Sequence, residues 1–193
     1  MSISPFRSLP TLVLASCGTA EAIADRLPGP AAALAARLGR SLQSLGAVPD
    51  PQTLQALQEP AAASDPGAAV LALLPVDPGL WIEAQGTWAA ALGAWRQPVL
   101  LLLPAAELRR GSGAALVALL HQEGVPLVGV LQLGGDWEPE DRRRDGLPWI
   151  GCWPESALTN ADSGAAASGA AAEQAGATLF CLRRALQGLV GGQ

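Results

Sequence analysis

The chain of 193 residues contains no lysine, because all twelve of its basic residues are arginine. An arginine can replace a lysine on a protein surface, but it cannot replace a catalytic lysine, since the two groups differ in geometry and acidity. The absence therefore excludes Schiff-base and pyridoxal phosphate chemistry. It also excludes a phosphate-binding loop in which a lysine contacts the β- and γ-phosphates of a nucleotide.

Cysteine and histidine are also scarce, and tyrosine is absent. Cys17, Cys152 and Cys181 lie far apart and form no C-x-x-C motif or Cys/His cluster. A structural zinc or iron–sulfur site is therefore not expected, and no metal ligand is assigned. Buried thiols in a reducing, cytoplasmic compartment are the simplest interpretation. The single histidine, His121, lies on a predicted helix with no nucleophile near it in sequence, so no catalytic residue is assigned.

Positive charge is in short supply, and the formal net charge is −5. Nucleic acids and anionic membranes require clustered positive charge, so neither is expected as a partner. One basic run, Arg142–Arg144, stands among acidic neighbours that largely neutralise it, which favours a solvated loop over a phosphate-binding patch. These neighbours are Glu138, Glu140, Asp141 and Asp145.

Long hydrophobic runs are missing, and no segment is long enough to cross a membrane. Residues Leu14–Cys17, followed by Gly18, have the form of a bacterial lipoprotein cleavage box, with Arg7 upstream. The apolar stretch Leu9–Ala15 is short for a signal sequence and contains a proline. A first β-strand explains the same residues, and lipidation of Cys17 is the alternative.

Apolar runs alternate with helical patterns along most of the chain, which predicts a parallel sheet between helix layers. We expect one domain over 1–193 with a Rossmann-like three-layer α/β fold and a mostly parallel sheet of about five strands. Residues 155–170, rich in Ala, Ser and Gly, are expected to be flexible. The predicted strands are 11–16, 68–74, 98–103, 126–133 and 147–153. The predicted helices are 20–27, 31–45, 80–96, 112–123 and 173–190.

Several boundaries rest on particular residues. Residues 28–30 (Pro-Gly-Pro) are expected to stop the first helix. The helix over 31–45 rests on leucines at positions 34, 38, 42 and 45, which have helical spacing. Ser112 is the expected N-cap of the helix over 112–123, and Gly124 its end. Residues 49–67 and 134–145 are expected to be loops, the first with one helical turn over 53–58.

The turn after the first strand is the natural ligand site of such a sheet, because free N–H groups at a helix start can bind a phosphate. Here Ser16, Gly18, Thr19 and Glu21 supply a flexible backbone and polar side chains. The stretch Gly18–Ala24 resembles the phosphate loop of flavodoxin-like FMN domains, in a form that is one residue short. The resemblance implies FMN as a cofactor. A close-packed turn of small residues is the other interpretation.

Flavodoxins also hold the flavin ring between aromatic side chains, often Trp and Tyr. This chain has no tyrosine. The loop over residues 104–111, which follows the third predicted strand, contains no aromatic side chain. Trp81 or Trp88 could cover one face of a ring only.

Residues 88–155 resemble the second half of the dethiobiotin synthetase group of P-loop proteins. The matching segments are Ala94–Leu102, Gly124–Val130 and Gly146–Gly151. The family's lysine-containing loop is absent, its acidic strand end is replaced by Pro75–Gly79, and its base-contacting asparagine is Gln132 or Leu133 here. The resemblance implies a nucleotide-binding sheet that lacks its catalytic apparatus.

Trp81, Trp88 and Trp95 are seven residues apart, so on one helix they would share a stripe. A core-facing stripe and an interface for a protein partner or second copy are both open. Three acids, Asp77, Glu107 and Asp136, follow predicted strands, where metal-binding or acid–base carboxylates would lie, but no pair can be assigned.

Two functions follow. The first is a non-catalytic α/β module of nucleotide-binding-fold ancestry that acts through a protein partner, a second copy or a small ligand. The second is a flavodoxin-like redox protein that binds FMN.

Overall fold

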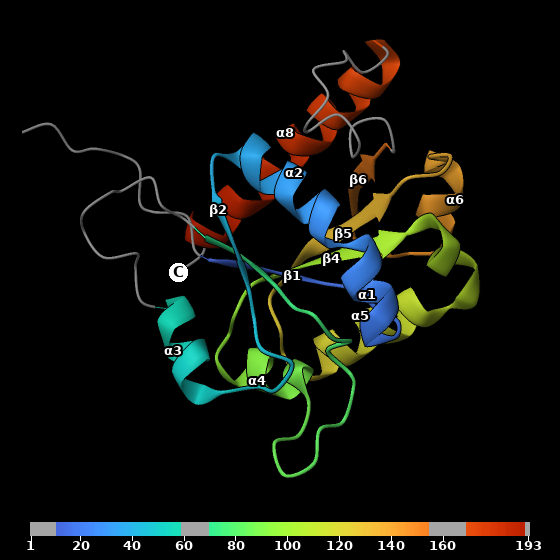
Figure 1. The fold of residues 1–193 in the computed structure, drawn as a ribbon. Coiled ribbons are helices and arrows are strands. Elements are labelled where there is room, and N and C mark those ends of the chain that lie inside the picture. Colours follow the sequence, from blue (N-terminus) through green and yellow to red (C-terminus); the bar gives the residue numbers. More distant parts are fainter. Residues whose placement is uncertain (1–10, 59–69, 155–168, 192–193) are drawn as a thin grey trace, which may run out of the picture.

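Six parallel strands form one sheet in the computed structural model, which describes residues 11–58, 70–154 and 169–191. Their order is β2-β3-β1-β4-β5-β6 (Figure 1). The predicted Rossmann-like α/β class is confirmed, with a sixth strand that the sequence did not indicate. The strands are β1 (Leu12–Ala15), β2 (Ser41–Ser44), β3 (Val70–Leu73), β4 (Val99–Pro104), β5 (Leu127–Leu133) and β6 (Trp149–Trp153).

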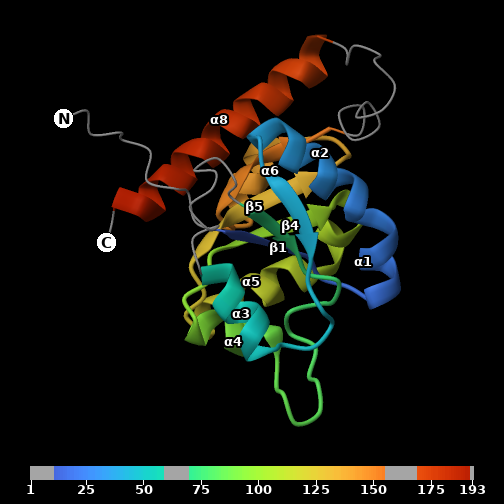
Figure 2. The same cartoon turned by 60° about the vertical axis from the view of Figure 1, so that its left-hand side comes forward.

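Helices cover both faces of the sheet. One face packs against α1 (Ala20–Arg26), α2 (Pro28–Leu38) and α8 (Gly169–Gly191), and the other against α3 (Pro51–Gln58), α4 (Trp88–Ala94) and α5 (Ser112–Gln122). Figure 2 shows α2 and α8 together on one side and α3 and α4 on the other. The shorter elements η1 (Ala105–Arg110) and α6 (Pro139–Arg144) follow β4 and β5.

The central strand β1 explains both layers of the core. All four of its residues are fully buried. Successive side chains of a strand point to opposite faces, so Leu12 and Leu14 pack on the α1, α2 and α8 side, while Val13 and Ala15 pack on the other. The segment considered as a lipoprotein box, Leu14–Cys17, thus begins in the last two residues of this central strand.

The predicted helix over 31–45 is wrong in its second half. The helix α2 ends at Leu38 because Gly39 adopts a left-handed conformation with φ of 65°. The N–H of Arg40 then bonds to the carbonyl of Ala35, which closes the helix in the manner of a Schellman motif. Leu42 belongs to the edge strand β2, and Leu45 follows it into the core.

The predicted helix over 80–96 is also too long. Thr87 caps α4 by accepting a hydrogen bond from the N–H of Ala90, so the helix begins only at Trp88. Before it, Ala84 and Gly86 have positive φ, which no helix contains. Residues 80–86 form a loop closed by a bridge between Ile82 and Gly86.

Three smaller predictions need correction. The proline-containing segment 28–30 ends α1 but starts α2, because proline is tolerated in a first helical turn. The N-cap of α5 is Gly111 rather than Ser112. The expected loop 134–145 contains α6.

Most of the segment predicted to be flexible, 155–168, lies outside the described residues. Among the helices described, none is both long and apolar enough to span a membrane.

Candidate functional site

A hollow of about 440 Å³ lies at the carboxyl ends of β1 and β3. The chain leaves β1 toward α1 on one face of the sheet and leaves β3 toward α4 on the other. Such a switch point is where open parallel sheets bind ligands. The hollow is lined by Cys17, Gly18, Asp77, Gly79, Leu80, Ser112, Ala115, Leu116 and Leu119.

The carboxylate of Asp77 ties together the two loops that form the hollow. One oxygen accepts the N–H of Gly18 at 3.0 Å, and the other accepts the N–H of Gly79 at 2.8 Å. One of the backbone donors that a phosphate loop would offer to its ligand, the Gly18 N–H, is therefore engaged by a negative charge of the protein itself. A phosphate at this position would face that carboxylate at close range.

A chain of hydrogen bonds runs from the floor of the hollow into η1. The thiol of Cys17 donates to the hydroxyl of Ser112 at 3.5 Å, and that hydroxyl donates to Glu107 at 3.3 Å. Glu107 is buried, and its other oxygen faces Arg110 at 3.3 Å and Arg26 at 3.9 Å. The Ser112 side chain therefore takes part in this series of hydrogen bonds and does not cap α5.

The surroundings of Cys17 keep its sulfur protonated. Burial raises the pKa of the Cys17 thiol, and the nearby carboxylates of Asp77 and Glu107 raise it further, while the hydrogen bond with Ser112 lowers it. Catalytic cysteines have the opposite setting, because the thiolate is the nucleophile and positive charge stabilises it. The site thus carries a thiol that is poorly suited to attack a substrate.

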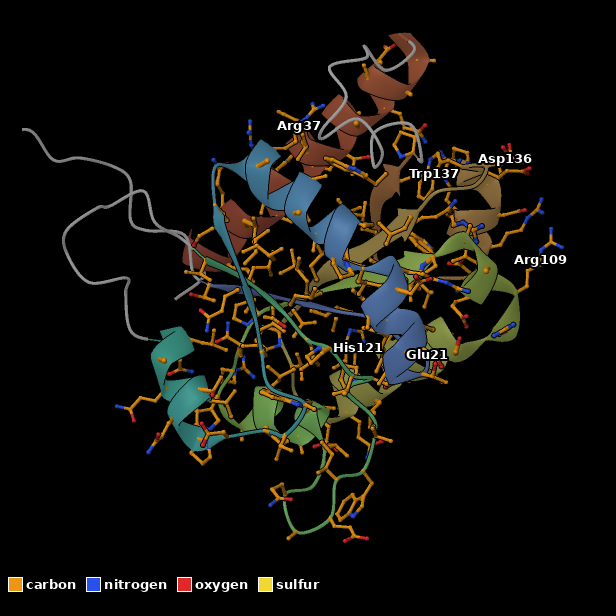
Figure 3. All side chains as sticks on the ribbon, in the orientation of Figure 1. Glu21, Arg37, Arg109, His121, Asp136 and Trp137 are labelled. Atoms are coloured by element: carbon orange, nitrogen blue, oxygen red, sulfur yellow. The ribbon has the colours of Figure 1, made fainter. Side chains whose placement is uncertain are left out.

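Of the four residues predicted to bind a phosphate, the structure places only Gly18 at the hollow. Gly18 lines the hollow, whereas Ser16 is buried beneath it and its hydroxyl makes no hydrogen bond with the described residues. Thr19 is the N-cap of α1 and accepts the N–H of Ala22. Glu21 is exposed on the first turn of α1, outside the lining (Figure 3).

The strand order also bears on the flavodoxin comparison. In flavodoxin the first strand lies between the second and the third. Here β1 lies between β3 and β4. The loop after β1 is therefore flanked by different neighbours from those of a flavodoxin phosphate loop.

The three tryptophans do not form one stripe. Trp88 is fully buried, and its ring N–H donates to the carbonyl of Ala47 at 2.9 Å. Trp95 is partly buried against the same core cluster. Trp81 is 72% exposed and stands beside Leu80, which is 51% exposed and lines the hollow. Of these three tryptophans, only Trp81 therefore offers an exposed ring to a partner, with Leu80 next to it in the chain.

Gln132, at the position of the expected base contact, is fully buried, and both ends of its side-chain amide make hydrogen bonds within the protein. Its amide nitrogen donates to the carbonyls of Gly134 and Asp136, and its amide oxygen accepts from Arg142 at 3.1 Å. Arg142 also pairs with Asp145 and lies over the ring of Trp149 at 5.2 Å. The first arginine of the basic run is thus a packed side chain and not part of a solvated loop.

The other predicted acids and the histidine lie outside the hollow. Asp136 stands with Trp137 at the β5–α6 end, well apart from Glu21 in the view of Figure 3. His121 is exposed near the end of α5 and is not among the lining residues. Within the described residues, no group of three or more His, Cys, Asp or Glu could hold a metal ion.

The sequence marked Asp77 as an acid after a predicted strand and Ser112 as a helix cap, but it did not place either beside the loop after β1, because they come from distant segments. Ser112 is 95 residues from Cys17 in sequence, and Asp77 is 59 residues from Gly18. The only signal in the sequence for these contacts was that neighbouring strands of a parallel sheet end at the same edge.

A scan against protein-family models gives no match to this chain, and a search of curated proteins gives no significant match.

Proposed function

We propose that the chain is a non-catalytic α/β module of nucleotide-binding-fold ancestry, which acts by holding a small organic ligand in the hollow between β1, β3 and α5. The single observation that carries the proposal is the engagement of the Gly18 N–H by Asp77, beside an open hollow at the switch point of the sheet. The loop occupies the position of a ligand site in such sheets, but its Gly18 N–H already donates to Asp77 and is not available to a phosphate.

The state of the polar groups supports a binding role. The Cys17 thiol is kept protonated, and Glu107 is paired with arginines, so neither is set up as a nucleophile or free base. Most other lining residues are aliphatic or glycine, as expected of ligand pockets with a few polar contacts.

Exposed Leu80 and Trp81 favour a second route of action, through a protein partner. Leu80 lines the hollow and Trp81 follows it in the chain, and tryptophan is enriched among residues that dominate binding energy. A partner that recognised this loop would contact the hollow as well.

FMN is the alternative ligand, supported by the match over Gly18–Ala24. The carboxylate of Asp77 and the position of β1 in the sheet count against it. The visible absorption spectrum separates the two proposals. We expect a colourless protein whose tryptophan fluorescence is unchanged by added FMN, and a bound flavin spectrum would replace our proposal with the alternative.

A thermal-shift screen with small organic fragments tests the proposal directly. Ligands that bind the folded state raise the melting temperature. We expect hits with the wild type that disappear in Ala115→Phe, which fills the hollow from an exposed position on α5. Ala118→Phe, exposed on the same helix but outside the lining, is the matched control and should keep the hits. Hits that persist in Ala115→Phe, or no hits in any variant, would contradict the proposal.

A further inference from the structure

The charge and lining of the hollow point to its ligand class. We infer that it binds a small organic cation, namely an amine with an aliphatic body. The ammonium would lie on the Asp77 carboxylate and the body along α5. This inference rests on the proposed function, because it concerns the ligand of the same hollow.

Asp77 has acceptor capacity to spare. Within the described residues each of its oxygens accepts one hydrogen bond, and both bonds come from backbone N–H groups. A carboxylate offers about four acceptor sites in total. An ammonium group, with three donors and no acceptor, complements what remains.

No positive side chain of the described residues lines the hollow. Arg26 and Arg110 contact Glu107, and neither is among the lining residues. The negative charge of Asp77 is thus balanced at the lining only by backbone dipoles. A ligand with a positive charge would complete the pairing, and one with a negative charge would meet an uncompensated carboxylate.

The rest of the lining fits an aliphatic chain. Leu80 borders the hollow from the loop after β3, while Ala115, Leu116 and Leu119 border it from α5. Burial of each CH₂ group on such a wall contributes favourably to binding. Since the polar contacts gather at Asp77, Cys17 and Ser112, a ligand with one polar end and an apolar body matches the site.

A matched series of six-carbon ligands tests the inference by calorimetry at neutral pH. The three probes are n-hexylammonium, 1-hexanol and hexanoate, which share a chain and differ in head-group charge. We expect hexylammonium to bind the wild type about tenfold more tightly than hexanol, as a charge-assisted contact implies. Hexanoate should bind more weakly than hexanol.

Asp77→Asn removes the charge and keeps one carbonyl acceptor for the backbone. We expect it to weaken hexylammonium binding about tenfold and to change hexanol binding by less than about twofold. Asp136→Asn removes an exposed acid at the β5–α6 end and is the control, with affinities like those of the wild type. The hexanol affinity of Asp77→Asn also shows that the variant keeps an intact hollow.

The outcomes separate this inference from the proposed function. Equal binding of hexanol and hexylammonium, lost in Ala115→Phe, would overturn the cation class and keep the hollow as a ligand site. Tight binding of hexanoate would overturn it as well. If none of the three binds, the inference fails, and the fragment screen alone decides whether the hollow binds anything.

Discussion

The N–H of Gly18 donates to the carboxylate of Asp77 at 3.0 Å, although the two residues are 59 positions apart. Gly18 follows the central strand β1, and Asp77 follows its neighbour β3. In a parallel sheet the carboxyl ends of strands meet at one edge, so this contact is a direct result of the strand order. It joins two loops and gives the hollow its charge.

Removal of the Asp77 carboxylate should weaken the fold. We expect Asp77→Ala to lower the free energy of unfolding by about 1–2 kcal/mol, because two backbone N–H groups lose a charged acceptor. Water can replace the acceptor at exposed Gly18, which limits the loss. Urea denaturation measures it, with Asp136→Ala as a control expected within about 0.5 kcal/mol of the wild type. Equal stability of both variants would show that the contact contributes nothing.

The buried thiols predict a loss of stability at alkaline pH. Burial raises the pKa of the Cys152 thiol to about 11, and nearby Arg142 lowers it in part. In the unfolded chain a thiol loses its proton near pH 8.5, while the folded protein keeps it. The stabilising contribution is therefore complete below about pH 8.5 and lost as pH rises toward 11, by roughly 3 kcal/mol.

This dependence is unusually simple to measure, because the chain has no lysine or tyrosine side chain to titrate in the same window. Urea denaturation at several pH values between 8 and 10.5 should give a falling free energy of unfolding. Cys152→Ala should flatten the slope, and Cys17 accounts for a further part, since its pKa is also raised. Cys181→Ala, at an exposed thiol, is the control and should keep the wild-type slope. A flat profile for the wild type would contradict the burial of both thiols.

Trp88 and Trp81 should differ sharply on replacement. Trp88→Ala removes a fully buried ring and its bond to Ala47, so we expect a loss of about 3–5 kcal/mol in unfolding free energy. Trp81→Ala should change stability by less than about 0.5 kcal/mol, because the side chain is 72% exposed. Denaturation followed by far-UV circular dichroism gives both values. A large loss on replacing Trp81 would place that residue in the core.

Gly93 allows the close approach of α4 to the end of α5. A Cβ atom on Gly93 would lie 1.9 Å from the carbonyl oxygen of Glu123, so Gly93→Ala should cost about 1–3 kcal/mol as the helices separate. Gly176 on α8 has open space at the same position. Gly176→Ala should therefore stabilise the protein by about 0.5–1 kcal/mol, as expected in a helix interior. Thermal unfolding of the pair tests the packing, and a neutral Gly93→Ala would refute it.

Most of the sheet could be predicted because buried parallel strands are nearly continuous apolar runs. The exception is β2, whose residues Ser41–Ser44 are all exposed at the edge of the sheet. Leu42 and Leu45 also continue the helical spacing of Leu34 and Leu38, so the pattern extended the helix through Gly39. The left-handed conformation of Gly39 ends the helix there, and this outweighs the leucine spacing.

The site was harder to predict than the fold. The loop after β1 was identified from Gly18, but its partners Asp77 and Ser112 are brought to it by strand order and helix packing. Sequence reasoning assigned Ser112 to a helix cap, and placed Trp81 on a helix that begins only at Trp88. Strand order is a property of the whole sheet, and no local pattern in the chain contains it.

The central claim is that the hollow beside Gly18 is a ligand site closed to phosphate. Amide chemical shifts from ¹H–¹⁵N spectra test it most directly, since Gly18 and Gly79 donate the two N–H groups held by Asp77. We predict that a fragment hit shifts these two amides together with those of Ser112 and Leu119, while inorganic phosphate and FMN leave them unchanged. Shifts of Gly18 on addition of phosphate or FMN, or fragment shifts confined to other surfaces, would contradict the account.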